Sequence, residues 1–265
     1  MGNMLTTNVA VTGGTSTVQY LVTGSGSGLV LVHGTAGTPS SWQPVIDALS
    51  GRCRVVAPTL SGSGGTSDPG GDLSVDDLAA QVVAAADAAG LDTPPPRWAL
   101  ARHGCRHCRR RPRARAGRRP VRARRLMAAD RRSAFQFDLL ARLLLTDPEL
   151  TWRYILLHVS TRAAQESTDF EALVHGNMPV SAVRQFDFNA RVDITDRVAA
   201  VTAPTQVIAG RHDQIVPMGL QQQLAEAILH AKQTILPTAH ALPFDQPDLF
   251  IKLLADFLAE TAAKR

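Results

Sequence analysis

The sequence predicts an α/β protein with a doubly wound, mostly parallel sheet of about eight strands and an inserted set of helices. Continuous apolar runs, typical of strands covered on both faces, alternate along the chain with helical patterns. Such alternation favours parallel strands joined by right-handed crossovers. With 265 residues, 45% of them hydrophobic, the chain is long enough for one large domain that contains an inserted part.

The first ninety residues predict a hairpin followed by two strand–helix units. The runs TTNVAVTGG and TVQYLVTGSG alternate and end in glycine, as hairpin strands do. GLVLVHG and CRVVAPTL read as buried strands, and Pro39 to Leu49 between them suits a short helix. Ser74, with Asp77 three residues later, resembles a capping box at the start of an alanine-rich helix that Gly90 ends.

A helical pattern then extends from Ser133 to Val198, with interruptions at Pro148 and Pro179. We therefore expect a helical lid at residues 133–199. It would be inserted in a core formed by residues 1–132 and 200–265. Strands and helices return in the second part of this core, as TQVIAG, a helix from about Pro217 to Leu229, QTILP, and a helix from Pro247 to about Ala262.

Positive charge is concentrated in one segment of the chain. Between Arg97 and Arg125 there are 13 arginines and no acidic residue, whereas the rest of the chain has 15 basic and 23 acidic residues, a net charge of −8. The body of the protein is therefore acidic, and its basic character is confined to this segment.

Features of secreted and membrane proteins are missing from the sequence. It has no run of eighteen apolar residues and no signal-peptide pattern. Its three cysteines are too few for a disulfide scaffold in a chain of this size. We therefore expect a soluble cytoplasmic protein without a membrane partner.

Three local patterns suggest a catalytic site, and each follows a predicted strand. The small turn His33-Gly34-Thr35 can direct backbone N–H groups toward a developing oxyanion, although a plain turn would look similar. Asp213 can orient a histidine, although in isolation a turn-capping role is the commoner one. His240, in a loop between two prolines, has the better position for a general base.

In this order, the three patterns resemble the α/β-hydrolase family, which includes serine esterases, lactonases and haloperoxidase-like enzymes. The resemblance covers residues 17–92 and 133–264. It implies an oxyanion hole at Gly34 and Thr35, and Asp213 and His240 as the acid and base of a Ser-His-Asp triad. It implies no cofactor and a small-molecule substrate.

The nucleophile that the resemblance requires is missing from the sequence. The family's nucleophilic serine precedes the acid and stands in a G-x-S-x-G turn. That turn should lie between Gly90 and Ser133, near Leu100 and Ala101, but G-x-S-x-G occurs nowhere in the chain.

A shift of reading frame accounts for both the missing serine and the arginine run. With GC-rich codons, RWALARHG read one nucleotide later permits Val-Gly-His-Ser-Leu-Gly-Met, a nucleophile turn of the family's kind. The shifted codon at the serine position cannot encode Asp or Cys, which favours a serine enzyme. We therefore interpret residues 94–129 as a frameshifted segment that displaces a buried strand and its helix.

Two alternative interpretations of the same segment remain. His103, Cys105, His107 and Cys108 resemble zinc ligands, but no second pair follows at the spacing of a structural zinc site. The arginines could bind nucleic acid, although Trp98 is the segment's one aromatic residue and no nucleic-acid module is recognisable. Neither pattern agrees with the rest of the chain, so we expect neither metal nor nucleic acid.

The resulting hypothesis is a serine hydrolase of a small ester, lactone or thioester. The chain as written lacks its serine and should be impaired. Cofactor-free haloperoxidase or perhydrolase chemistry, and lyase or cyclase steps, are alternatives on the same scaffold. The sequence predicts no oligomeric state.

Overall fold

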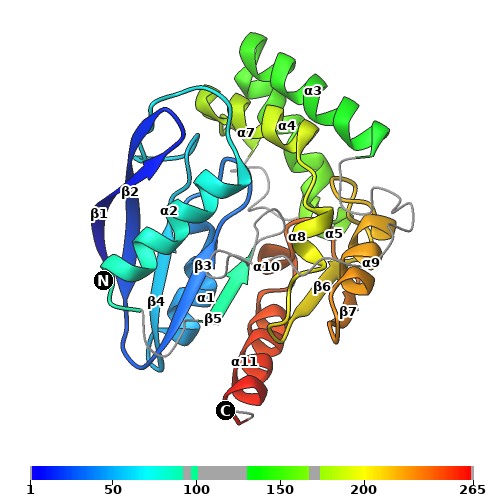
Figure 1. The fold of residues 1–265 in the computed structure, drawn as a ribbon. Helices are drawn as coiled ribbons and strands as arrows, with labels where there is room; N and C mark the ends of the chain where they lie inside the picture. The colour runs from blue at the N-terminus through cyan, green and yellow to red at the C-terminus, as the bar shows by residue number, and fades with distance from the viewer. Residues whose placement is uncertain (1, 92–96, 101–129, 167–173, 264–265) are drawn as a thin grey trace, which may run out of the picture.

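The computed structural model describes residues 2–91, 97–100, 130–166 and 174–263, and for residues 97–100 it describes the backbone alone. These residues form two sheets, with helices packed around them (Figure 1). The described strands are β1 (Asn3–Val11), β2 (Gly14–Thr23), β3 (Ser27–Val32), β4 (Cys53–Pro58), β5 (Arg97–Leu100), β6 (Gln206–Gly210) and β7 (Lys232–Leu236).

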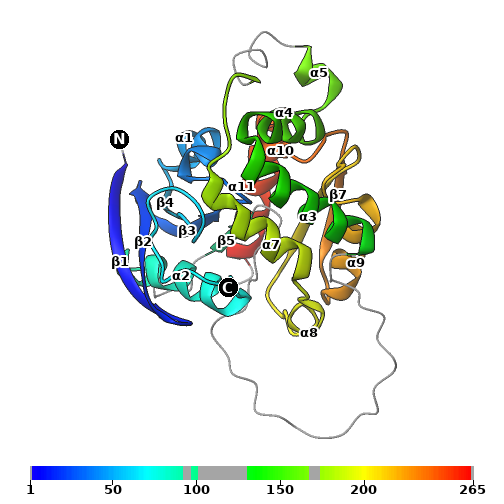
Figure 2. The same ribbon diagram turned by 90° about the horizontal axis from the view of Figure 1, so that it is seen from above.

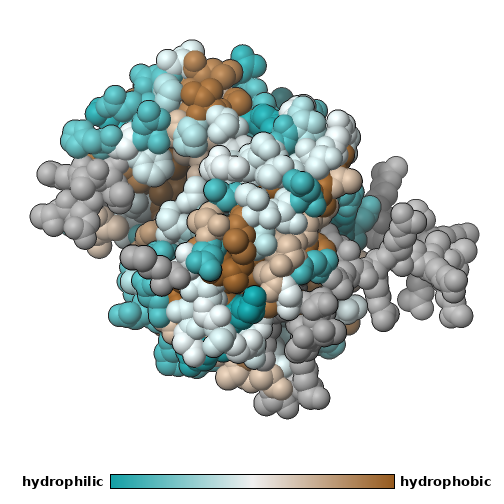
Figure 3. Space-filling view, turned by 90° about the vertical axis from the view of Figure 1, so that its left-hand side faces the viewer, coloured by the Kyte–Doolittle hydropathy of each residue, from teal (hydrophilic) through white to brown (hydrophobic). Residues whose placement is uncertain are grey.

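The first sheet has the strand order β1-β2-β4-β3-β5. The predicted hairpin is confirmed, because β1 and β2 pair antiparallel from Asn3↔Val22 to Val11↔Gly14. β2 is also antiparallel to β4, whereas β3 is parallel to both β4 and β5. The face that carries β1 and β2 is mainly polar in Figure 3, with hydrophobic residues in separate patches.

Helices cover both faces of this sheet. Leu29 and Leu31 of β3 pack on one face with α1 (Gln43–Leu49) and α11 (Pro247–Ala263). The alternate residues Val30 and Val32 pack on the other face with α2 (Val75–Ala88). The sheet is therefore buried on two sides, as the continuous apolar pattern of its strands predicts.

The helix ends follow the sequence signals closely. Ser74 caps α2 by accepting a hydrogen bond from the Asp77 N–H, and Gly90 follows the helix with φ +71°. The segment between β3 and β4 contains the 3₁₀ helix η1 (Pro39–Trp42) and α1, where one short helix is expected.

Strand β5 corrects one sequence-based prediction. Residues 94–129 are expected to displace a buried strand, but Arg97–Leu100 form a strand parallel to β3, in the register Leu29↔Arg97 to Val32↔Leu100. Four residues of the basic segment therefore have the backbone geometry that this place in the sheet requires. Residues 101–129, where the displaced helix would follow, lie outside the described part of the chain.

The second described sheet consists of β6 and β7, which are parallel. Helix α9 (Met218–Ala227) connects them, and α10 (Leu242–Asp245) and α11 follow β7. The described residues thus contain seven strands in sheets of five and two, and a single sheet of about eight is not seen among them. Three of the five strand pairings are parallel, in agreement with a mostly parallel fold.

Residues 131–198, which we call the helical segment, contain no described strand. Pro148 is the first residue of one of its helices and Pro179 precedes η2, in agreement with the predicted interruptions. Figure 1 shows α3, α4 and α7 beyond the end of the sheet toward which β5 points, and Figure 2 shows α7 between α3 and the first sheet. The elements of the segment are α3 (Arg131–Thr146), α4 (Pro148–Val159), α5 (Arg162–Gln165), η2 (Val180–Ala182), α7 (Val183–Arg191) and α8 (Thr195–Val198).

Throughout the described part of the chain, no helix combines the length and the hydrophobicity needed to cross a bilayer.

Candidate active site

The first part of the candidate site is the turn after β3. Gly37 N–H donates to the Gly34 carbonyl at 3.1 Å, which closes a tight turn over Thr35 and Ala36. Ala36 has φ +56°, a left-handed conformation that glycine adopts more readily. A Cβ atom at Gly37 would lie 2.9 Å from the Cβ of His33, so only glycine fits there without displacement.

His33 supports this turn and is not a proton carrier. Its side chain is buried, its Nδ1 lies 2.6 Å from the Gly34 carbonyl oxygen, and its Nε2 accepts a hydrogen bond from the Leu60 N–H at 2.9 Å. Burial lowers the pKa of His33 to about 4, although the hydrogen bond with Gly34 acts in the opposite direction. The neutral imidazole therefore joins the turn to the loop after β4.

Side chains of α7 hold the two central residues of the turn. The Thr35 hydroxyl accepts a hydrogen bond from Asn189 Nδ2 at 2.7 Å. The Ala36 N–H donates to Gln185 Oε1 at 2.6 Å. The Thr35 N–H donates to no acceptor among the described residues, so it is a backbone donor of this turn that a ligand could use.

The second part of the site is the carboxylate of Asp213, in the loop after β6. Its side chain is fully buried. Oδ1 accepts hydrogen bonds from the backbone N–H groups of Ile215 and Val216 at 2.9 and 2.8 Å, and Oδ2 accepts one from Gln221 Nε2 at 3.3 Å. These donors fix the orientation of the carboxylate.

The third part is His240, in the loop after β7. Its Nδ1 lies 3.1 Å from Oδ2 and 3.2 Å from Oδ1 of Asp213, so the structure brings the two predicted residues together across 27 positions of sequence. Asp213 thereby favours the tautomer with the proton on Nδ1, which leaves the lone pair on Nε2. The His240 side chain is 22% exposed, in contrast to its fully buried partner.

The loop that carries the histidine is held on both sides by backbone hydrogen bonds. Ala239 N–H donates to Asp245 Oδ2 at 2.8 Å, and Ala241 N–H donates to the Val159 carbonyl at 2.9 Å. The other oxygen of Asp245 accepts a hydrogen bond from the Thr161 N–H at 3.3 Å. Sequence reasoning missed Asp245, because an Asp five residues after a histidine carries no distinctive signal.

The nucleophile position is only partly described. The pairing Val32↔Leu100 places the carboxyl end of β5 beside the end of β3, where the turn of Gly34 and Thr35 begins. Ala101 lies outside the described residues, as do the cysteines and histidines of the zinc-like pattern and the arginines from Arg102 to Arg125. Among the residues that the structure does describe, no group of His, Cys, Asp or Glu could hold a metal ion.

The model of a family described as "Alpha/beta hydrolase family" matches residues 29–253. The chain belongs to this family. The match begins at the strand before the Gly34–Thr35 turn and continues past His240, so it spans all three parts of the candidate site. The predicted α/β fold class and the assignment to a hydrolase family are thereby confirmed.

One curated relative and two solved structures illustrate what this alpha/beta hydrolase resembles. Pyrrolizixenacetamide deacetylase of Xenorhabdus hominickii is 33% identical over 261 residues, which cover 92% of this chain and 96% of the relative. An esterase of Thermogutta terrifontis has a TM-score of 0.73 at 16% identity and covers 98% of this chain and 99% of its own. The enol-lactonase of Burkholderia xenovorans LB400 has a TM-score of 0.73 at 18% identity, covering 96% and 100%.

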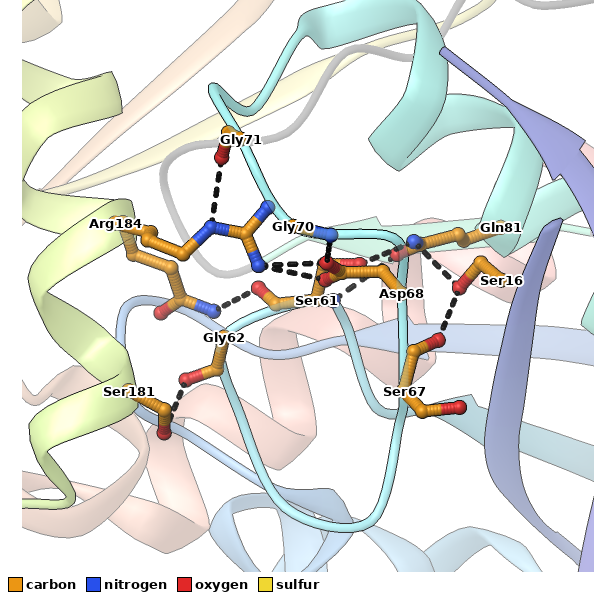
Figure 4. Close-up of polar contacts among 11 residues, drawn as sticks. Ser16, Ser61, Gly62, Ser67, Asp68, Gly70, Gly71, Gln81, Ser181 and Arg184 are labelled. Atoms are coloured by element: carbon orange, nitrogen blue, oxygen red, sulfur yellow. Dashed lines mark hydrogen bonds and ion pairs between the residues drawn. The ribbon is translucent and has the colours of Figure 1, made fainter. Parts of the chain in front are cut away.

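In this alpha/beta hydrolase, a buried polar network connects α7 to the loop after β4 (Figure 4). Arg184 Nη1 lies 2.7 and 2.8 Å from the two carboxylate oxygens of Asp68, and its Nε donates to the Gly71 carbonyl. Burial raises the pKa of Asp68, but hydrogen bonds from Ser61, Gly70 and Arg184 outweigh this effect and lower the pKa overall.

Two further ion pairs extend this connection. Arg191 pairs with Asp72 at 2.8 Å, and Arg197 of α8 pairs with Asp76 of α2 at 2.7 Å. Three arginines from the C-terminal part of the helical segment thus meet three aspartates spaced four residues apart. We call these pairs, from Arg184–Asp68 to Arg197–Asp76, the ion-pair ladder; they fix the helical segment against the first sheet.

Proposed function

We propose that the intact enzyme is a serine hydrolase that transfers an acyl group of a small organic molecule to water. The observation that carries this proposal is the 3.1 Å contact between His240 Nδ1 and the buried carboxylate of Asp213. An oriented imidazole with a buried carboxylate behind it is the proton-transfer unit of Ser-His-Asp catalysis. The unit follows two strands of the fold, as the acid and histidine of this family do.

In the proposed mechanism, a serine encoded out of frame near Leu100 and Ala101 attacks the carbonyl carbon. His240 Nε2 takes the hydroxyl proton as the new C–O bond forms, and then donates it to the leaving group as the old bond breaks. Water repeats the sequence on the acyl-enzyme and releases the acid. Asp213 stabilises the imidazolium in both steps.

The oxyanion of each tetrahedral intermediate would accept hydrogen bonds from the Thr35 N–H, beside Gly34, and from the N–H after the serine. A donor of this kind stabilises the transition state by about 2.7 to 4 kcal/mol. The Thr35 N–H has no acceptor within the described part of the chain, which supports this assignment, because a donor already engaged by the protein could not bind the oxyanion.

We propose that the substrate is an ester, lactone or thioester and add small amides to this range. The amide is suggested by the deacetylase, whose name describes removal of an acetyl group from an acetamide and which is 33% identical. We further propose that the helical segment forms the lid, which the sequence places at residues 133–199. Three aromatic residues of this segment cluster with Ala36 and Val216, which flank the site: Phe137, Trp152 and Phe186. The segment is therefore placed to limit the size of the acyl group that the site accepts.

We propose that the chain as written has little or no hydrolase activity, because residues 94–129 are read out of frame and contain no serine. The first measurement is the nucleotide sequence from the codon for Gly90 to the codon for Ser133. Codons that cannot yield serine when offset would overturn the frameshift.

The activity is tested on a protein with the reading frame restored. We expect hydrolysis of p-nitrophenyl acetate and of an aryl acetamide, and loss of both with His240→Ala. An active restored protein that is indifferent to His240→Ala would overturn the mechanism. Peroxide-dependent halogenation without hydrolysis would favour the perhydrolase alternative.

A further inference from the structure

Helix α7 carries two buried side-chain amides one turn apart, on the same face of the helix. Gln185 and Asn189 are 6% and 2% exposed, and both reach the turn after β3. Buried side-chain amides are rarely without a hydrogen-bond partner, because each unsatisfied buried polar group destabilises the fold. Here both amides bind the two central residues of the turn, Thr35 and Ala36.

The orientation of the Gln185 amide is fixed by its other contacts. Its Nε2 donates to the Ser61 carbonyl at 2.8 Å and lies 3.0 Å from the Ser63 hydroxyl. Because the amide nitrogen faces two oxygens, the amide oxygen is directed at the Ala36 N–H. Gln185 thus connects three pieces of chain: α7, the turn and the loop after β4.

Gln185 binds Ala36, the residue of the turn whose backbone conformation is the least favourable. Ala36 is in the left-handed region at φ +56°, which is unfavourable for a residue with a Cβ. Binding of the Ala36 N–H stabilises this conformation, and the Asn189 contact fixes the neighbouring Thr35 hydroxyl. With both contacts in place, the Thr35 N–H still has no acceptor among the described residues.

We propose that Gln185 and Asn189 are positioning residues that set the geometry of the oxyanion turn from the helical segment. The proposal rests on the proposed function, in which the Thr35 N–H binds the oxyanion. In this proposal, helix α7 both covers the active site and sets the geometry of one of its turns. The position of α7, which Arg184 fixes through Asp68, thereby determines the direction of the Thr35 N–H.

The test uses the full chain as it exists, labelled with ¹⁵N, and follows amide signals by NMR. Gln185→Met removes the acceptor of the Ala36 N–H at similar side-chain volume. We expect exchange of the Ala36 amide proton to become about tenfold faster or more, the value of one hydrogen bond, and the Thr35 amide signal to shift. Asp187→Asn, on the exposed face of α7, is the matched control and should leave both signals unchanged.

A second pair of variants tests the contact from the turn, in case Gln185→Met does not fold. Thr35→Val removes the hydroxyl that Asn189 binds, whereas Thr35→Ser keeps it. We expect the Asn189 side-chain amide signals to shift in Thr35→Val and to stay in place in Thr35→Ser. Equal spectra for the two variants would overturn the proposal, as would unchanged Ala36 exchange in a folded Gln185→Met protein.

These readouts require no turnover. An inactive frame-restored enzyme would therefore count against the proposed function alone, whereas unchanged amide signals would count against the positioning role alone.

Discussion

His240 and Asp213 meet edge to edge, with the imidazole Nδ1 3.1 Å from a carboxylate oxygen that has no exposed surface. The exposure is graded along this pair, from the buried acid to the partly exposed ring. The residue that exchanges protons with a substrate must be the accessible member of such a pair, and here that residue is His240. The predictions that follow concern this pair and the groups that hold it in place.

Asp213→Asn should lower kcat of the frame-restored enzyme by roughly 10⁴-fold, the effect of the corresponding change in a serine protease triad. The amide presents a donor where Nδ1–H needs an acceptor, so the ring adopts the unproductive tautomer. The measurement is steady-state hydrolysis of p-nitrophenyl acetate. Asp256→Asn, an exposed carboxylate paired with Lys252, is the control and should change kcat little.

Asp245→Ala should loosen the histidine loop, because the N–H groups of Ala239 and Thr161 lose their acceptor. We expect a loss of about 1 to 3 kcal/mol in the free energy of unfolding and a lower kcat in the restored enzyme. Urea denaturation and kinetics measure the two effects. Asp248→Asn, exposed three residues later, should reproduce neither.

His33 should make the fold sensitive to mild acid. Its pKa is about 4 in the folded protein and about 6.5 when unfolded, so protons bind preferentially to the unfolded chain between these values. The contribution of His33 is complete above pH 6.5 and is lost as pH falls toward 4. Urea denaturation at pH 7 and pH 4.5 measures this loss, which we expect to be about 2 kcal/mol between these two pH values. His33→Gln should show a smaller loss between these pH values; an equal loss would exclude His33 as the source.

Ala36→Gly should raise the free energy of unfolding by up to about 1 kcal/mol, because glycine has no Cβ atom to make a φ of +56° unfavourable. The same substitution inside a helix, Ala225→Gly in α9, should lower it by about 1 kcal/mol. Opposite signs in thermal denaturation would confirm the strain at Ala36. Destabilisation by both substitutions would contradict it.

Arg184→Met should destabilise the protein by about 2 kcal/mol or more, since Asp68 would keep a nearly buried charge without its main partner. Arg142→Met breaks an exposed pair with Asp138 and should change stability by less than about 1 kcal/mol. Urea denaturation of the two variants measures the difference. Similar losses of stability in the two variants would mean that burial does not strengthen the Arg184–Asp68 pair.

The sequence predicts best the groups that sit where a strand ends. Asp213 and His240 are found by that rule, and their contact across two loops agrees with it. Gln185, Asn189 and Asp245 could not be found in this way. Their partners are backbone N–H groups or hydroxyls far along the chain, and a partner of this kind leaves no pattern in the residues around it.

The limits of sequence reasoning also appear at β5. Arg97–Leu100 stand in a segment whose composition argues against a buried strand, yet they pair with β3 along four residues. Strand pairing joins backbone groups, so a short stretch can take this place in the sheet largely independently of its side chains. The composition of a segment predicts how well its side chains suit burial, but it predicts the path of the backbone less well.

The ion-pair ladder combines one nearly buried pair with two exposed pairs. The carboxylate at the Arg184 end is 7% exposed, whereas those of Asp72 and Asp76 are 79% and 73% exposed. Dissolved salt weakens exposed pairs far more than buried ones. Rising ionic strength should therefore weaken the Arg191–Asp72 and Arg197–Asp76 pairs together and leave the Arg184–Asp68 pair, with the neighbourhood of Gln185, attached. The end of the segment at α8 would then become a hinge before the oxyanion turn is disturbed.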